Sequence, residues 1–329
     1  MERSQRRLGA LASALRPPPL GSALAMAARC PAQCQRHSSA ATGSATGTAA
    51  AAATEQPPPQ KILVISDIHG NAEALRAVME AERDCDSVIF LGDSILSGPQ
   101  VRETMGLLQS LHAAKGGTWI GGNHDEEMLH PELVENYPAT WKSLNDWIFG
   151  QLVESDYEFV RANYVPEGDH EVGGIRMRLI HGTGPHGPER NALPDSTDER
   201  LTSMADAAWL GSEGARSDCP FVLFGHSHVQ FQRVIDGVTY INPGSVGQSR
   251  TGKQIACYGV FLDGEWEFRQ VGYDLSPFVA AFERACDEGG MDDVEGGPEF
   301  RRWLIDGAIE GFGIGKSEPW TTLSRQGYN

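Results

Sequence analysis

The stretch Lys61-Ile-Leu-Val-Ile65-Ser-Asp67-Ile-His69-Gly70-Asn71 joins a short apolar run to a carboxylate and an imidazole. The nearly all-apolar run 61–65 suits a strand that is buried on both faces of a sheet. Asn71 can then begin the next helix, because its side chain is a good N-cap. The stretch therefore predicts a buried strand, a polar turn and a helix.

The same order recurs twice along the chain. Ser87-Val-Ile-Phe-Leu91 ends at Gly92-Asp93, and Thr118-Trp-Ile-Gly121 ends at Gly122-Asn123-His124-Asp125, with a helix expected around 101–112 between them. This alternation predicts a βαβαβ unit with right-handed crossovers. Such sheets bind ligands outside the carboxyl ends of their strands, where all three polar blocks are expected.

The alternation of strand and helix changes in residues 126–170 and in the later half of the chain. The helical sequence in residues 126–170 has one apolar face, which holds Trp141, Leu144, Ile148 and Leu152. We therefore predict a packed helical insertion around 126–170, which is a candidate wall of the site. Later strands are expected at 175–180, 220–224, 238–242, 256–262 and 266–271. Turns such as Asp236-Gly237 favour hairpins between them. We predict an α/β fold in which two facing mixed sheets are flanked by helices, in four αββα layers.

The two ends of the chain differ from this body of residues 61–273. Residues 1–60 are rich in Ala, Ser, Thr and Pro and carry six Arg, with Leu8, Leu11 and Leu15 at helical spacing. This pattern is typical of an organellar transit peptide for mitochondrion or plastid, and a disordered extension is the alternative. At the other end, 274–329 is predicted as a helical extension, with helices near 276–288 and 298–311, and a tail.

Composition excludes several classes of function. The first 60 residues hold two acids, so 21 of the 27 basic and 42 of the 44 acidic residues fall in the remainder. Such an acidic body disfavours extended nucleic-acid binding. No apolar stretch approaches the roughly 18 residues of a membrane span, so we expect a soluble protein. Six scattered cysteines without a Cys-x-x-Cys pair are interpreted as reduced thiols, and oligomeric state stays open.

Five polar blocks together indicate a metal centre. A lone His at a strand end is usually a core residue, but five such blocks in order, each beside Gly, rarely arise by chance. The candidate ligands are Asp67, His69, Asp93, Asn123, His181, His226 and His228. Mixed nitrogen and oxygen donors suit Mn, Fe, Zn, Co or Ni and disfavour Mg. Seven donors exceed one tetrahedral zinc, so two ions that share a bridging carboxylate fit better.

The full series of blocks, with Gly92-Asp93-Ser-Ile-Leu-Ser-Gly98-Pro99 and Gly225-His226-Ser227-His228 among them, resembles the calcineurin-like metallophosphoesterase superfamily. Asn242-Pro243-Gly244-Ser245-Val246-Gly247 is similar to a turn of its small bacterial YfcE-type phosphodiesterase branch. The resemblance covers about residues 61–273.

The resemblance implies a ligand set and a mechanism. Asp67, His69, Asp93 and His228 would hold one ion; Asp93, Asn123, His181 and His226 would hold the other. Asp93 would be the bridge, and a metal-bound hydroxide would attack phosphorus in line with the leaving oxygen. His124 would protonate the leaving group, and Asp125 would orient His124. Because some members lack this His and act as scaffolds, its retention favours an enzyme over a binding module.

One departure from the superfamily narrows the substrate. Phosphoprotein phosphatases carry an Arg shortly after the Gly-Asp block, and residues 94–99 hold none. We therefore expect a Mn-dependent phosphodiesterase for a small or nucleotide-like ester; a phosphomonoesterase, a protein phosphatase or a non-catalytic scaffold is the alternative. Arg190 and Arg250 are candidate substrate contacts, or else solvated surface residues.

Overall fold

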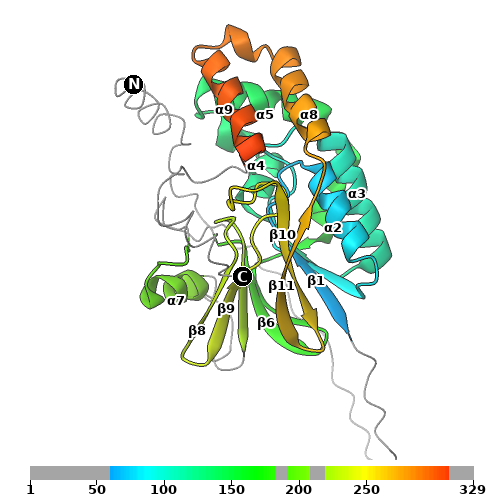
Figure 1. Cartoon of the computed structure of the whole chain (residues 1–329), viewed down its shortest axis with the longest axis vertical. Coiled ribbons are helices and arrows are strands. Elements are labelled where there is room, and N and C mark those ends of the chain that lie inside the picture. Colours follow the sequence, from blue (N-terminus) through cyan, green and yellow to red (C-terminus); the bar gives the residue numbers. More distant parts are fainter. Residues whose placement is uncertain (1–59, 183–191, 208–218, 311–329) are drawn as a thin grey trace, which may run out of the picture.

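The computed structural model describes residues 60–182, 192–207 and 219–310, and these form two β-sheets that face each other between helices (Figure 1). The predicted α/β fold of facing mixed sheets is confirmed. Three predictions lie outside the described residues: the targeting signal within 1–59, the substrate contact Arg190, and the tail beyond residue 310.

The first sheet has the strand order β11-β10-β1-β2-β3-β4. Its parallel strands are β1 (Lys61–Ile65), β2 (Ser87–Phe90), β3 (Thr118–Ile120) and β4 (Tyr164–Val165). β10 (Ile255–Leu262) pairs antiparallel with both β1 and β11 (Glu265–Gly272). The sheet is mixed because a parallel βαβαβ unit is extended by a hairpin on the far side of β1.

The second sheet has the order β5-β6-β7-β9-β8. Its strands are β5 (Gly168–Val172), β6 (Ile175–Ile180), β7 (Phe221–Phe224), β8 (Phe231–Ile235) and β9 (Val238–Asn242). β6, β7 and β9 run parallel, whereas the edge strands β5 and β8 are antiparallel to their neighbours. Asp236 and Gly237 both have positive φ, at 49° and 82°, as a tight hairpin between β8 and β9 requires.

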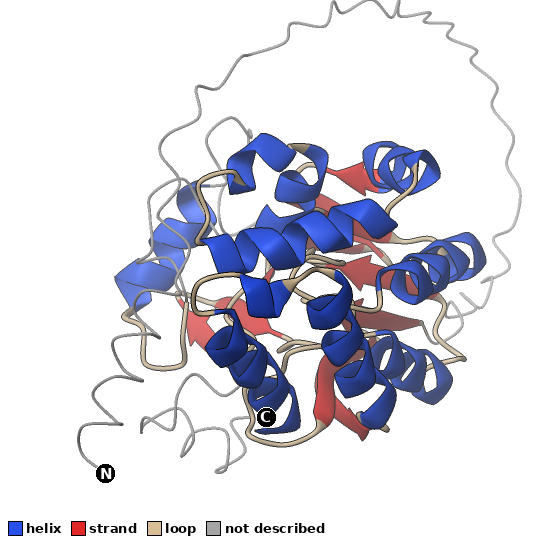
Figure 2. Ribbon diagram, turned by 90° about the horizontal axis from the view of Figure 1, so that it is seen from above, coloured by secondary structure: helices blue, strands red, loops and turns tan. Residues whose placement is uncertain are grey.

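Helices cover the outer face of each sheet. On the first sheet lie α2 (Ala72–Ala81), α3 (Val101–Lys115), α5 (Ala139–Gln151), α6 (Glu154–Asn163), α8 (Ser276–Glu288) and α9 (Gly297–Glu310), which Figure 2 shows from above. α7 (Asp198–Ala207) packs on the second sheet through Leu201 and Ala205. None of the described helices is both long and apolar enough to cross a bilayer.

Three apolar clusters separate these layers. One joins the helices to the first sheet, a second lies between the sheets and includes Val64 and Leu223, and a third lies beneath α7. The C-terminal helices belong to the first cluster, because Phe282 of α8 and Phe300 of α9 are fully buried in the core that holds Leu63. Helices α8 and α9 are thus part of the domain's core.

The helical insertion predicted for 126–170 differs from the structure at both ends. The insertion begins earlier, with α4 (Asn123–Leu129). It continues through η1 (Pro131–Val134), α5 and α6, and its last helix ends at Asn163. β4 then forms an edge strand of the first sheet, and β5 forms an edge strand of the second. The reason is local: Gly173 and Gly174, both at positive φ, turn the polar stretch 168–172 into an edge strand beside β6. Edge strands carry polar residues that hide their pattern.

Candidate metal centre

The predicted ligands follow the carboxyl ends of strands in both sheets. Asp67 and His69 come after β1, Asp93 after β2, and Asn123 at the start of α4 after β3. His181 directly follows β6 of the second sheet, and His226 and His228 follow β7. The crevice outside the parallel strands of the two facing sheets therefore brings all five blocks together.

Five of the seven candidate ligands have a left-handed backbone. Their φ angles lie between 46° and 65°, in the residues Asp67, His69, Asp93, His226 and His228. Side chains other than Gly rarely adopt this region, which costs about 1–3 kcal/mol at each position and tends to mark functional sites. The surrounding structure must therefore hold these turns in place.

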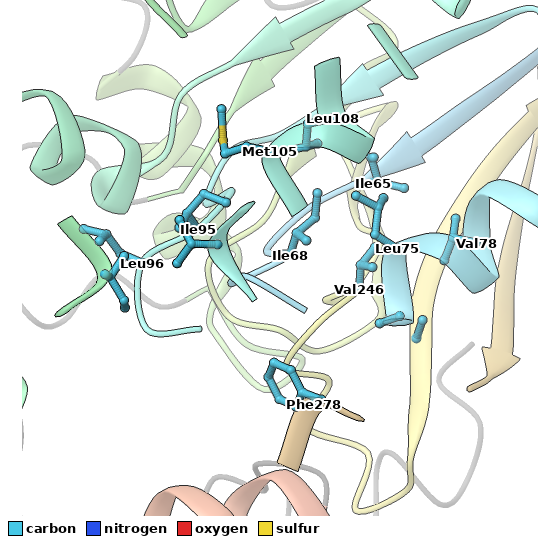
Figure 3. Packing of buried hydrophobic residues seen from close by; sticks show 14 of the residues in the cluster. Ile65, Ile68, Leu75, Val78, Ile95, Leu96, Met105, Leu108, Val246 and Phe278 are labelled. Atoms are coloured by element: carbon cyan, nitrogen blue, oxygen red, sulfur yellow. The ribbon is translucent and has the colours of Figure 1, made fainter. Parts of the chain in front are cut away.

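Buried apolar residues between the ligands hold the turns. Ile68 separates Asp67 from His69 and is fully buried, and Ile95 and Leu96 after Asp93 are buried in the same cluster. Figure 3 shows these side chains together with Val246 and the helical residues against which they pack. The turns after β1 and β2 are thus anchored in the core by apolar neighbours.

Close contact between main chains also fixes the first turn. A Cβ on Gly98 would lie 1.6 Å from the carbonyl oxygen of His69 and 2.7 Å from the Cα of Gly70. Gly70 itself has a φ of 56°. The two strand-end loops can approach this closely because neither Gly carries a side chain.

The first group of donors consists of Asp67, His69 and His228. His228 Nε2 lies 3.3 Å from Asp67 Oδ1 and 3.0 Å from His69 Nε2. One donor atom from each residue lies within 4.8 Å of the others, a spacing that one ion could bridge. His69 Nε2 also lies 3.7 Å from Asp93 Oδ2, and His69, Asp93 and His124 form a further group of donors that overlaps this one.

The second group consists of Asp93, His181 and His226. His181 Nε2 lies 3.2 Å from Asp93 Oδ2, and Asp93 therefore stands between the two groups. The buried Asn123 Oδ1 has no hydrogen-bond partner among the described residues. Buried polar atoms normally have partners, so this oxygen indicates a donor that is arranged for a cation.

Three of the histidines share the same outer contact. The Nδ1 atom of each lies at a main-chain carbonyl oxygen: His69 at Leu96 (2.8 Å), His181 at Leu91 (2.6 Å) and His228 at Gln248 (3.0 Å). The Nδ1–H donates to the carbonyl, and this contact turns Nε2 toward the other donors. This is the usual arrangement of imidazole ligands in metal sites.

The charges of the centre favour a cation. Burial lowers the pKa of His69 and of His226 to about 3, so both imidazoles are neutral, as ligation requires. Burial also lowers the pKa of His181, but the carboxylates Asp93 and Asp67 overcome it and raise this pKa to about 10. The two buried carboxylates therefore attract positive charge strongly.

Asp125 has a different role from the one predicted. Its carboxylate accepts hydrogen bonds from the main-chain nitrogens of Asp93 (2.7 Å), Ser94 (3.0 Å) and Gly122 (2.8 Å), and from the Ser94 hydroxyl. It joins the loops after β2 and β3, and the prediction that it orients His124 is wrong. Consecutive residues of a helix point about 100° apart, so Asp125 and His124 face different ways.

Glu127 takes the place beside His124. His124 Nδ1 lies 2.7 Å from Glu127 Oε2, at the i, i+3 spacing of α4. Burial lowers the pKa of His124, but Glu127 and Asp93 raise it to about 9. The sequence contained a signal for this pair, because a helix that begins at Asn123 puts residues 124 and 127 on one face.

The predicted substrate contact Arg250 lies at the edge of the centre. Its main-chain nitrogen donates to the carbonyl oxygen of His228 over 3.2 Å. The loop from Asn242 to Gly247 reaches Asp67 from the same side, because the Ser245 hydroxyl and the Gly247 nitrogen both donate to the Asp67 carbonyl oxygen. A contact between Arg250 and substrate stays a prediction.

Known proteins resemble this chain in sequence and in fold. It is 27% identical over 228 residues to the uncharacterised protein MJ0912 of Methanocaldococcus jannaschii, covering 65% of this chain and 88% of the relative. It is 24% identical to a probable metallophosphoesterase of Mycoplasma pneumoniae, over 60% and 86% of the two chains. The crystal structure of a metallophosphoesterase from Sphaerobacter thermophilus matches with a TM-score of 0.55 at 23% identity, over 76% and 99%.

The family is shown by a match over most of the folded body. The family model described as the calcineurin-like phosphoesterase superfamily domain matches residues 61–263. This range holds all seven candidate ligands and every strand of the two sheets except β11. The finer resemblance to the YfcE-type branch stays a prediction. The chain belongs to the calcineurin-like phosphoesterase superfamily.

Proposed function

We propose that this protein is a phosphoesterase that binds two divalent transition-metal ions, with Mn as the expected metal, and hydrolyses phosphodiesters. The observation that carries the proposal is the position of Asp93 between two groups of donors, with His124 beside them. Asp67, His69 and His228 would hold one ion, and Asn123, His181 and His226 would hold the other, with Asp93 shared.

The donor set fits such ions. The buried Asn123 Oδ1 has no hydrogen-bond partner among the described residues, and carbonyl contacts turn three Nε2 atoms inward; both features suit metal ligation. When bound, two such ions supply Lewis-acid polarisation of the phosphoryl group and lower the pKa of water toward about 7.

His124 is proposed as the group that protonates the leaving oxygen. Its Nδ1 is bound to Glu127, so its Nε2 is the nitrogen available to a substrate. Its main-chain nitrogen donates to Asp93 Oδ1 over 2.9 Å, which fixes the start of α4 against the proposed bridge. A proton donor in this position typically contributes about 10² to 10⁴ in rate.

We propose a small or nucleotide-like substrate and not a phosphoprotein. After Asp93, where protein phosphatases of the superfamily carry Arg, this chain has Ile95 and Leu96, and both are buried in the core. That segment therefore offers no cation to a phosphopeptide. The formal net charge of −17 likewise disfavours long anionic partners.

The test is metal content followed by turnover. The purified protein should hold about two transition-metal ions per chain and, with Mn, should hydrolyse bis(4-nitrophenyl) phosphate faster than 4-nitrophenyl phosphate or a phosphopeptide. Asp93→Asn should lose the turnover that depends on both ions. His130 is exposed at the end of α4, and His130→Ala should behave as wild type. Absence of bound metal, or a preference for the phosphopeptide, would refute the proposal.

A further inference from the structure

We propose that Glu127 and Tyr137 are positioning residues, which together hold the His124 ring so that its Nε2 faces the substrate. This inference rests on the proposed function, because it assigns a role to residues that act through the proposed proton donor. It adds a Tyr137–Glu127–His124 chain to the seven candidate ligands.

The two oxygens of Glu127 are each used once. Oε2 lies 2.7 Å from His124 Nδ1, and Oε1 accepts a hydrogen bond of 2.6 Å from the Tyr137 hydroxyl. Tyr137 comes ten residues later in the chain, after η1, so it fixes the carboxylate from outside α4. With both oxygens held, the plane of the carboxylate and hence the direction of the imidazole are set.

Because the Glu127 carboxylate is buried, it would be costly to leave it without hydrogen-bond partners. The Glu127 side chain is 1% exposed, whereas that of His124 is 20% exposed. A buried carboxylate needs hydrogen-bond partners to offset its lost hydration. The ring it holds keeps one accessible side, as a group that meets substrate requires.

Other carboxylates nearby are already engaged. Asp125 accepts from three main-chain nitrogens, and Asp93 Oδ1 accepts from the His124 main-chain nitrogen. The ring contacts His69 edge-on, with centroids 5.4 Å apart, so His124 stands beside the first donor group. Glu127 is thus the carboxylate that directs the ring from the side away from the centre.

The experiment compares leaving groups. A positioned proton donor matters more for a basic leaving oxygen, as in phenyl phosphodiesters, than for the weakly basic 4-nitrophenolate. Glu127→Gln should lower kcat for a phenyl diester by about 10 to 100 fold and lower it much less for the 4-nitrophenyl diester. Tyr137→Phe should shift the same ratio in the same direction by less, and neither variant should lose metal.

Two matched controls separate positioning from general damage. Glu126→Gln removes an exposed carboxylate from the same helix, and Tyr157→Phe removes a half-buried phenol from α6. Both should leave the ratio of the two substrates at the wild-type value. Tyr137→Phe, which removes a single hydroxyl, keeps the test available if Glu127→Gln fails to fold.

A double-mutant cycle with His124→Ala decides between the outcomes. If Glu127 acts through His124, Glu127→Gln should have no further effect on the leaving-group ratio once His124 is Ala. An undiminished effect in that background, or loss of metal from Glu127→Gln, would overturn the inference and leave the proposed function standing. Unchanged turnover in His124→Ala alone would overturn the proposed function, and the inference with it.

Discussion

The strand-end loops and helix α4 both present histidines to the same centre, but they hold them differently. In the loops, His69, His181 and His228 place Nδ1 against a main-chain carbonyl oxygen. On α4, His124 places Nδ1 against the carboxylate of Glu127. Either partner fixes the tautomer and direction of the ring, and the carboxylate of Glu127 in addition stabilises the protonated form of His124.

The difference teaches how one fold can assign two tasks to one residue type. His69, His181 and His228 are anchored by main-chain carbonyl oxygens, which fix the direction of their Nε2 atoms. His124 is held by Glu127 of the same helix, and Glu127 is held in turn by the Tyr137 hydroxyl. The outer contact of His124 thus differs from those of His69, His181 and His228, although all four rings lie at the same centre.

Alanine substitutions give the largest expected effects and test this comparison directly. His69→Ala should lose bound metal and turnover together, because it removes a donor of the first group. His124→Ala should lower turnover by about 10² to 10⁴ while metal content, measured by elemental analysis, stays at the wild-type value. Equal metal loss in both variants would mean that His124 is a ligand as well.

Chelation is expected to lower stability by a smaller amount. An ion that binds the folded chain alone stabilises it by about 2.7 kcal/mol at a concentration of 100 times its Kd. Wild type and His124→Ala should therefore show the same rise in Tm when Mn is restored after chelation, and His69→Ala should show less. A reduced rise in His124→Ala would contradict the separation of the two histidines.

Gly98→Ala tests the loop side of the comparison. Its Cβ would meet the His69 carbonyl oxygen at 1.6 Å, so the loops must move apart. We expect the free energy of unfolding to fall by about 1–3 kcal/mol, with weaker metal binding. Gly106→Ala is the matched control, because among the described residues nothing beyond its chain neighbours and its own helix backbone lies within 4 Å of the added Cβ. Helix α3 should gain about 0.5–1 kcal/mol. Unchanged metal affinity in Gly98→Ala would show that the loop contact does not set the ligand geometry.

Asn71→Ala should give the smallest effect and separate structure from chemistry within one block. Asn71 Oδ1 accepts from the Ala74 nitrogen over 3.0 Å and caps α2, and its Nδ2 donates to the Gly247 carbonyl oxygen. Loss of such a cap costs about 1 kcal/mol. Chemical denaturation should detect this loss, and two bound ions should remain. Loss of metal would place Asn71 among the groups that support the centre.

Much of the fold could be predicted because its signals are local. Apolar runs that end in Asp67 and Asp93 marked buried parallel strands, and the Asp236-Gly237 turn marked a hairpin. The run before His181 marked a strand, but its parallel pairing with β7 was not predicted. β5 was missed because its edge position leaves its residues polar, although the Gly173-Gly174 turn pairs it with β6. The C-terminal helices were found, but their place in the core of the first sheet was not.

The candidate site divides in the same way. The residue types and their order along the chain determined which side chains would meet, because the carboxyl ends of parallel strands share one edge of a sheet. The tertiary structure alone decided what holds each of them: the carbonyls behind the loop histidines, the Asp125 contacts with three amides, and the Tyr137 hydroxyl behind Glu127. The physical reason is that a strand end follows from nearby sequence, whereas the partner of a buried polar atom depends on which distant segment packs against it.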